Sequence, residues 1–307
     1  MLEMLTVDDF ARHFGVPVGD VPSACRQLIL SRDFRFRTLA GADRDAVVLR
    51  VMKTLKADLE VSGPGRQPRW EAGWGENLKE FIESNYDPAK LVPKFVRRKE
   101  VIRLDGNYIM PESETFETDY VCVLRAWIFS RFFQGVDALY EFGVGSGHNL
   151  VEASKYLPAA KLVGLDWAPV SKQILEELHR HRGLNVEGHI FDLNNPDASL
   201  RIEDNAGVLT IGTLEQMGRN FGPFIDFLME RKPRVCVHVE TLYEVYNQDN
   251  LVDWLAAAYL EKRNYLRGFL ARMRELEAEG KVRILDLRRT FGSFYHDGYT
   301  YLVWEPL

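Results

Sequence analysis

From residue 138 onward, short apolar runs alternate with stretches in which apolar residues recur every three or four positions. The runs predict buried strands, and the stretches predict amphipathic helices. The predicted strands are 138–143, 161–166, 186–192, 206–212 and 234–240, and the predicted helices are 147–157, 169–182 and 221–231. Such alternation is typical of an α/β fold in which helices cover both faces of a mostly parallel sheet.

The end of the chain departs from this alternation. A long helical pattern runs from Asn250 to Glu279 and is followed by two strand-like segments, 282–287 and 299–304. A turn region, Phe291 to Gly298, separates them. Two strands with a glycine-containing connection predict an antiparallel hairpin, which we expect at one edge of the sheet.

The first 115 residues predict a mainly helical region. Two short helices are expected between Thr6 and Ile29, and an amphipathic helix between Arg44 and Leu59. The segment Trp70–Gly75, which follows several glycines and prolines, is expected to be a loop. An apolar helix over Phe116–Phe133 then leads into the first strand of the sheet. We therefore divide the chain into residues 1–115 and 116–307.

The most specific pattern lies where the first strand, 138–143, meets its helix. There the chain reads Glu-Phe-Gly-Val-Gly-Ser-Gly from Glu141 to Gly147. Glycine accepts positive φ and lets the backbone approach a ligand closely, and the helix start presents free N–H groups. A dinucleotide-binding fingerprint would need a small residue at position 148, which is His148 here. The spacing therefore disfavours an NAD-dependent oxidoreductase.

This acid-x-Gly-x-Gly-x-Gly pattern resembles the first motif of the class I S-adenosylmethionine-dependent methyltransferases. The ends of the next three strands, at Asp166, Asp192 and Gly212, match the family in order. The resemblance covers residues 139–307. It implies S-adenosylmethionine as cofactor and a Rossmann-like methyltransferase fold, with a seven-stranded, mostly parallel sheet, a C-terminal antiparallel hairpin and a helical N-terminal extension.

The resemblance also assigns cofactor-binding residues. It places the aminocarboxypropyl group over the glycine loop, its amine near an acid and its carboxylate at the start of the helix. The resemblance assigns the ribose hydroxyls to an acid at the end of the neighbouring strand, where the motif spacing also places an acid. It assigns adenine to residues at the end of the third strand or to a stacking indole. The residues so placed are Glu141, Gly143, Gly145, Gly147, Asn149, Asp166, Trp167, Asp192, Leu193 and Gly212.

Catalytic candidates come from the later strand ends, because acceptors of open α/β sheets bind above the carboxyl ends of the strands. Glu215, Glu240 and His296 are the candidates for a base that removes a proton from a hydroxyl. In the alternative interpretation, one of the glutamates holds the cofactor's amine or caps a loop. The sequence does not choose among them.

Composition and charge limit the kinds of partner that we expect the protein to bind. A net charge of -6 argues against a dominant nucleic-acid-binding surface. A local basic cluster, with members between Lys94 and Arg103, is expected to be solvated or to meet an anionic group of the acceptor. The three cysteines, Cys25, Cys122 and Cys236, lack metal-ligand spacing and suggest reduced thiols of a cytoplasmic protein. We expect no metal site and no membrane segment.

Together these patterns predict a cytoplasmic S-adenosylmethionine-dependent methyltransferase whose residues 1–115 cover or shape the acceptor site. Its expected acceptor is a small polar molecule, with a hydroxyl of a sugar or sugar-containing metabolite favoured. Leu214–Gly218 and Phe294–Gly298 are also loosely similar to methyltransferases of bacterial surface-sugar pathways. Two alternatives stay open, namely a module that binds the cofactor without catalysis and a DNA-binding regulator that uses the N-terminal helices.

Overall fold

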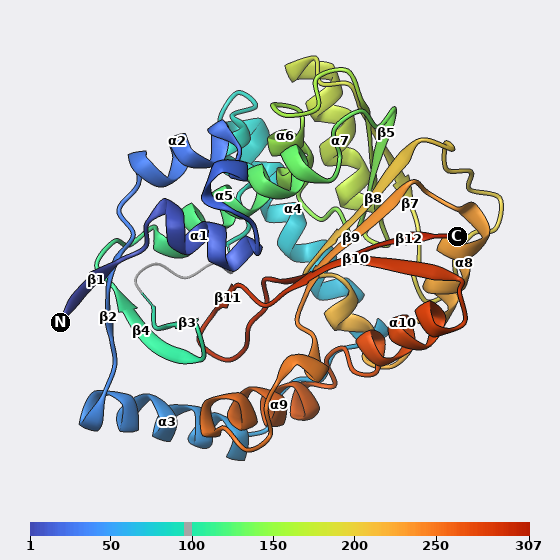
Figure 1. Ribbon diagram of the computed structural model, residues 1–307. Coiled ribbons are helices and arrows are strands. Elements are labelled where there is room, and N and C mark those ends of the chain that lie inside the picture. The colour runs from blue at the N-terminus through green and yellow to red at the C-terminus, as the bar shows by residue number, and fades with distance from the viewer. Residues whose placement is uncertain (95–99) are drawn as a thin grey trace.

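A seven-stranded sheet forms the centre of the protein, in the strand order β10-β12-β9-β8-β5-β6-β7 (Figure 1). The structure is a computed structural model and describes residues 1–94 and 100–307. Strands β5 to β9 are parallel, whereas β12 lies antiparallel between β9 and β10. The strands are β5 (Ala138–Phe142), β6 (Lys161–Asp166), β7 (Val186–Ile190), β8 (Ala206–Ile211), β9 (Val235–Glu240), β10 (Val282–Arg288) and β12 (Thr300–Pro306). The predicted sheet with its antiparallel terminal pair is thus confirmed.

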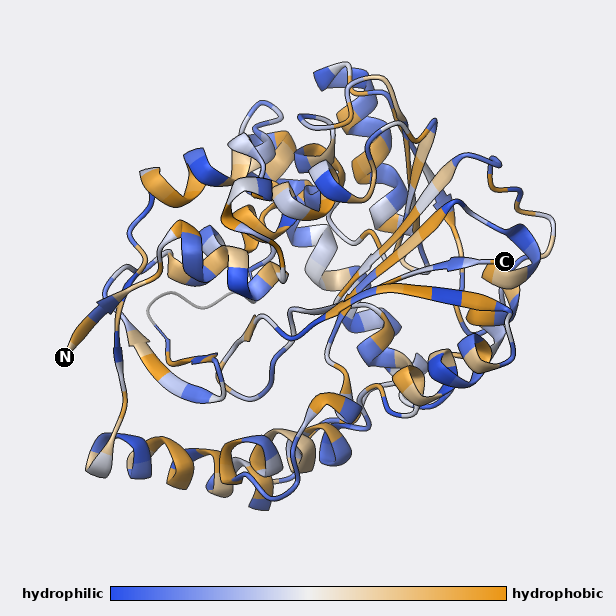
Figure 2. Cartoon of the chain, viewed as in Figure 1, coloured by the Kyte–Doolittle hydropathy of each residue, from blue (hydrophilic) through white to orange (hydrophobic). Residues whose placement is uncertain are grey.

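Helices cover both faces of this sheet, because successive strand residues point to opposite sides. On β5, Leu139 packs into one apolar cluster, whereas Tyr140 and Phe142 pack into another. The first cluster joins the sheet to α5 (Phe116–Arg131), α6 (His148–Ala153) and α7 (Pro169–Arg182). The second joins it to α8 (Gly222–Arg231) and α10 (Phe269–Ala278). The sheet strands are largely hydrophobic, as their burial requires (Figure 2).

The N-terminal region contains a second sheet besides its helices. Its helices are α1 (Val7–Phe14), α2 (Ser23–Ser31), α3 (Gly41–Lys56) and α4 (Gln67–Glu83). The sheet has the order β1-β2-β4-β3-β11. Its strands are β1 (Leu2–Met4), β2 (Arg35–Thr38), β3 (Ile102–Leu104), β4 (Asn107–Pro111) and β11 (Phe291–Gly292). The sequence did not predict this sheet, because its strands are short and because β11 comes from the connection between β10 and β12.

Side chains from both sides of the proposed boundary at 115/116 share one apolar cluster. Phe10 and Phe34 of the N-terminal region, for example, pack against Tyr120 of α5. The division into residues 1–115 and 116–307 therefore stays a prediction, and the two regions share one continuous hydrophobic core.

Two local predictions were wrong. Trp70–Gly75, expected as a loop, lies within α4, since Pro68 occupies the first turn of that helix, where a missing N–H costs nothing. The long helical pattern that was expected to end at Glu279 is divided into α9 (Leu251–Arg263) and α10. The break falls at Asn264, which adopts left-handed backbone geometry with φ 53°.

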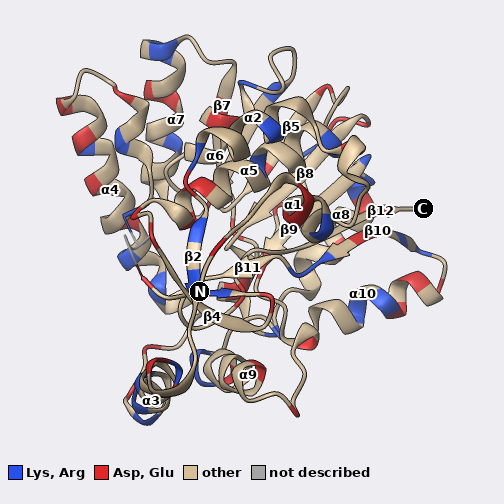
Figure 3. Cartoon of the chain, turned by 60° about the vertical axis from the view of Figure 1, so that its left-hand side comes forward, with Lys and Arg blue, Asp and Glu red and all other residues tan. Residues whose placement is uncertain are grey.

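The basic cluster is likewise not a uniform surface. Lys94 forms ion pairs with two glutamates of α4, and Arg97, Arg98 and Lys99 lie outside the described residues. Arg103 is fully buried, which contradicts its expected place on a solvated or anion-binding surface. Elsewhere, charges of both signs are interspersed on the outer faces of α4 and α10 (Figure 3).

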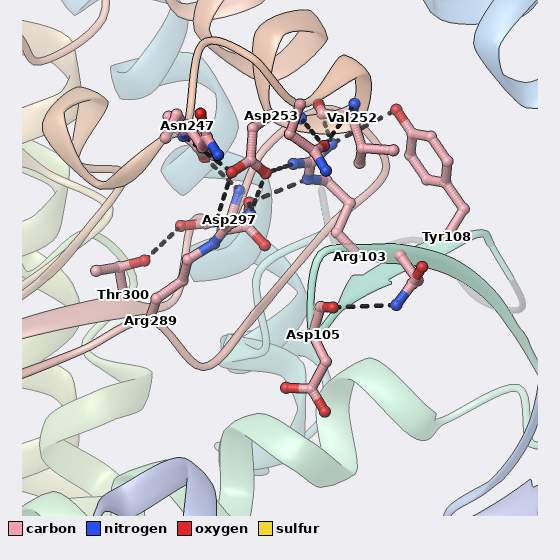
Figure 4. Close-up of polar contacts among 12 residues, drawn as sticks. Arg103, Asp105, Tyr108, Asn247, Val252, Asp253, Arg289, Asp297 and Thr300 are labelled. Carbon is pink, nitrogen blue, oxygen red and sulfur yellow. Dashed lines mark hydrogen bonds and ion pairs between the residues drawn. The ribbon is translucent and has the colours of Figure 1, made fainter.

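Arg103 belongs to a buried ion network that joins β3, α9 and the connection before β12 (Figure 4). Its Nε lies 3.0 Å from Asp297 Oδ2, and its Nη2 lies 3.4 Å from Asp253 Oδ1. Arg289 contacts the same two carboxylates, at 2.8 Å from Asp253 Oδ2 and 3.1 Å from Asp297 Oδ2. Two arginines thus balance two aspartates across segments that are far apart in the sequence.

Candidate active site

A cavity of about 620 Å³ lies beyond the carboxyl ends of β5 to β8. Residues of α4, α5 and the connection between β11 and β12 also line it. Most of the predicted site residues come together here. Those that line the cavity are Gly143, Gly145, Asn149, Asp166, Trp167, Asp192, Leu193, Gly212, Glu215 and His296. Glu141, Gly147 and Glu240 do not line it.

The glycine loop has the backbone geometry that its sequence suggested. Gly143, Gly145 and Gly147 all have positive φ, at 73°, 54° and 74°. A Cβ at Gly143 would lie 2.2 Å from Thr213, and one at Gly145 would lie 2.7 Å from the Trp74 ring. A side chain at either position would therefore need both a strained backbone and a displaced neighbour.

Trp70 and Trp74 of α4 stack on each other, with ring centroids 5.6 Å apart, and both line the cavity. Since Trp74 also packs on Gly145, it anchors α4 to the loop. The tryptophan pair thus both anchors α4, through Trp74, and forms part of the cavity wall.

Asp166 ties the end of β6 to the glycine loop. Its Oδ2 accepts a hydrogen bond from the Gly145 N–H at 2.8 Å, and its Oδ1 accepts one from the Ala168 N–H at 2.9 Å. Burial raises the pKa of this carboxyl to about 6, and the two backbone hydrogen bonds oppose that rise. Each oxygen keeps a second lone pair for a ligand hydroxyl.

Behind the loop, Asn149 connects an acid to a cation. Its Nδ2 donates to Glu141 Oε1 at 2.7 Å, and its Oδ1 accepts from Arg125 Nη1 at 3.0 Å. Burial raises the pKa of Glu141 to about 8. His148 lines the cavity beside them, and burial lowers its pKa to about 4. Sequence reasoning assigned no role to Arg125, although a charged residue flanked by apolar ones in the middle of a helix is a signal of one.

Glu240 supports the loop after β8, whose Thr213 packs against Gly143 of the glycine loop. Its carboxylate accepts hydrogen bonds from the N–H groups of Thr213, at 3.0 Å, and Glu215, at 3.1 Å, at the start of the short 3-10 helix Leu214–Met217. This is the loop-capping role that the sequence left open for one of the glutamates. The carboxylate is fully buried and does not line the cavity, so the geometry does not favour Glu240 as a base.

Glu215, in contrast, lines the cavity and has one side-chain hydrogen bond among the described residues, from Gln216 Nε2 at 2.9 Å. Burial, with the nearby charge of Glu240, raises the pKa of Glu215 to about 8. Gln216 in turn accepts from Arg66 Nη1 at 2.5 Å. A carboxyl that titrates near neutral pH and faces an open cavity is suited to proton transfer.

His296 lies in a group of aromatic side chains on the same side. Its ring centroid is 5.8 Å from that of Tyr259 and 5.7 Å from that of Tyr265, and Tyr259 stacks on Tyr295 at 4.5 Å. Burial lowers the pKa of His296 to about 4, so the imidazole is neutral at pH 7. The tyrosines give this part of the cavity a wall of rings with polar edges.

Two structural findings bear on metals and membranes. In residues 1–94 and 100–307, no three His, Cys, Asp or Glu side chains gather as a metal site requires. No helix of these ranges is long and apolar enough to cross a lipid bilayer.

No known family model matches the chain, and no curated protein matches it either. Several solved structures are similar to the chain. One is an O-methyltransferase of a trans-AT polyketide synthase from Brevibacillus brevis. It is 15% identical over 56% of this chain and 55% of its own, with a TM-score of 0.41. The chain thus spans about half the length of that protein. The mitomycin 7-O-methyltransferase is 13% identical over 99% of this chain and 88% of its own, with a TM-score of 0.44. An O-methyltransferase family 2 protein from Planctomyces limnophilus is 11% identical over 99% and 87%, with a TM-score of 0.43.

These likenesses are distant, and the fold rests on the chain's own strand order. That order places β12 antiparallel between β9 and β10 beside five parallel strands. The fold is a Rossmann-like methyltransferase fold. It puts the glycine loop after β5, at the middle of the sheet, where an open α/β sheet binds its ligand.

Proposed function

We propose that this protein is an S-adenosylmethionine-dependent methyltransferase that methylates a hydroxyl of a small polar acceptor. The observation that carries the proposal is one cavity whose lining has two chemically different parts. One part is the glycine loop with Asp166, and the other is Glu215 and His296 with the tyrosines. A cofactor and an acceptor would then meet above the carboxyl ends of the parallel strands.

The glycine loop and the residues at the carboxyl ends of β6 and β7 fit the cofactor. Gly143 and Gly145 line the cavity without side chains, so their backbone can pass under the aminocarboxypropyl group. Asp166 has free lone pairs for the ribose hydroxyls. Asp192 and Leu193 line the cavity after β7, where the resemblance places adenine, and Trp167, which also lines the cavity, offers a stacking surface. Each of these four roles is part of the proposal.

The bound cofactor would supply a methyl group on a sulfonium, which an acceptor oxygen displaces in line. The chain must therefore align the acceptor and take its proton. We assign the proton to the Glu215 carboxylate, because its raised pKa matches that task near neutral pH. We expect the neutral His296 ring and the side chain of Gln216 to orient the hydroxyl. Glu240 accepts a hydrogen bond from the Glu215 N–H and so supports the loop that carries Glu215.

A sugar hydroxyl is the acceptor that we favour. The carboxyl and amide groups of Glu215 and Gln216 can bond to several hydroxyls, while the rings of Tyr259 and Tyr265 can cover the apolar face of a sugar. The same groups would accept other small hydroxylated molecules, so the sugar is the finer part of the proposal.

Calorimetry on the full chain tests the cofactor first. We expect S-adenosylmethionine and S-adenosylhomocysteine to bind, and NAD to bind at least 100-fold more weakly. Binding of NAD without binding of either adenosyl compound would refute the proposal. Turnover is then followed as S-adenosylhomocysteine formation with monosaccharides, nucleotide sugars and phenols. Cofactor binding without turnover in any of these classes would favour the non-catalytic alternative.

A further inference from the structure

Arg125 of α5 is a buried cation that forms no ion pair with any acid in the described part of the chain. Its side chain lines the cavity, and the residue is only 4% exposed. Nη1 donates to Asn149 Oδ1 at 3.0 Å, Nη2 lies 3.5 Å from Cys122 Sγ, and Nε has no hydrogen-bond partner. Within residues 1–94 and 100–307, no carboxylate forms an ion pair with it. A guanidinium removed from water in this way is costly unless something anionic completes its contacts.

The other cations that line the cavity do have such partners. Lys94 pairs with glutamates of α4, and both Arg66 and Arg69 pair with Glu60. In the described part of the chain, Arg125 is thus the lining cation whose charge is available to a ligand. Its planar fork of N–H donors suits a carboxylate, which can accept two parallel hydrogen bonds.

An acid lies on the other side of the same asparagine. Asn149 donates to Glu141 Oε1, whereas Glu141 Oε2 is buried and has no hydrogen-bond partner among the described residues. Asn149 therefore lies between a cation and an acid. Next to the glycine loop, the site thus has a cation and a carboxyl group, each with an unused polar atom, and a nearby ammonium would favour the charged form of that carboxyl group. That arrangement is complementary to a zwitterionic α-amino acid group.

We propose that Arg125 binds the carboxylate of the cofactor's amino-acid end, with Asn149 setting its distance from Glu141. This inference rests on the proposed function. It adds a binding residue from a helix that precedes the glycine loop and lies outside the segment that resembles the methyltransferases. It also gives the site a selectivity, since an adenosyl compound without a carboxylate would leave Arg125 buried and unpaired.

The test compares two ligands that differ only in the carboxylate, S-adenosylhomocysteine and decarboxylated S-adenosylhomocysteine. Calorimetry with the wild-type protein should show the first binding about 10- to 100-fold more tightly, as expected for a charged hydrogen-bonded contact. In Arg125→Gln this preference should fall to within about 2-fold, because S-adenosylhomocysteine alone loses affinity. Arg125→Lys should keep part of it. Arg131→Gln, an exposed position on the same helix, is the matched control and should keep all of it.

Several outcomes would overturn the inference. One is a wild-type protein that binds the two ligands equally, a result that needs no variant and so does not depend on how Arg125→Gln folds. Another is an Arg125→Gln protein that folds, as judged by circular dichroism, and loses the same affinity for both ligands, which would mark a merely structural residue. If the wild-type protein binds neither ligand, the proposed function itself fails, and the two failures are thus distinguishable.

Discussion

Replacing Arg103 by Met tests whether the buried ion network holds the acceptor side of the cavity. The substitution keeps most of the side-chain volume but leaves Asp253 and Asp297 short of one cation. Both residues are at most 4% exposed, and Arg289 remains as their only arginine partner among the described residues. Removing one partner from a buried network costs about 3–5 kcal/mol, because a charge stays buried without compensation. Loss of the 2.9 Å bond to the Val252 carbonyl adds to the effect.

The free energy of unfolding is measured from urea titrations followed by circular dichroism. Arg283→Met is the matched control, since Arg283 is 62% exposed and pairs with Glu305 at the surface, so its loss should cost less than about 1 kcal/mol. The double variant Arg103→Met/Asp297→Asn should cost less than the sum of its single changes, because it removes both members of one pair. If Arg103→Met costs no more than the control does, the network does not stabilise the fold as we infer.

The same variant should act on the acceptor more than on the cofactor. Asp297 directly follows His296 in the chain, and Asp253 lies on α9 together with Tyr259, whose ring faces His296. A loosened network would therefore displace both walls of the tyrosine-lined half of the cavity. We expect acceptor KM to rise at least 10-fold at a temperature at which the variant is folded, with S-adenosylhomocysteine affinity changed less than 3-fold. Equal losses for both ligands would argue against this placement.

Three further results follow from the site. Asp166→Asn should weaken S-adenosylhomocysteine binding about 10- to 100-fold in calorimetry, by loss of charged hydrogen bonds, and unchanged affinity would remove Asp166 from the cofactor site. The raised pKa keeps Glu215 protonated below about pH 8, so turnover by the wild-type protein should rise from pH 6 to pH 8. The variant Glu215→Gln should be slow, and its rate should be nearly independent of pH. A variant as fast as the wild-type protein would exclude Glu215 as the base. Glu141 also keeps its proton at pH 7, because its pKa is about 8. Binding an ammonium beside it should therefore release that proton. Calorimetry in different buffers should show a buffer-dependent binding enthalpy, and Glu141→Gln should abolish this dependence.

The sheet could be predicted because its signals are local. An apolar run ending at Glu141, Asp166 or Asp192 marks both a buried strand and the edge at which parallel strands converge. Predicting these strands therefore also predicted that Asp166 and Asp192 share a cavity, whereas Glu141 does not line it. The short strands β1 to β4 carry no comparable signal, since β1 has three exposed residues and β3 has three buried ones. The edge strand that pairs with β3 is β11, which the chain supplies nearly 200 residues later.

The charged residues show the same limit more sharply. Arg103 stands near four other basic residues, an arrangement that ordinarily indicates a solvated surface. Its carboxylate partners nevertheless lie 150 and 194 residues away in the sequence. No local pattern distinguishes a buried arginine from an exposed one when its partners are so distant. Arg125 differs, because its helical neighbours are almost all apolar and nothing nearby in the sequence would pair with it. A lone cation in a helix that must be buried requires an anion from elsewhere, and where the folded chain provides none, a ligand is the remaining source.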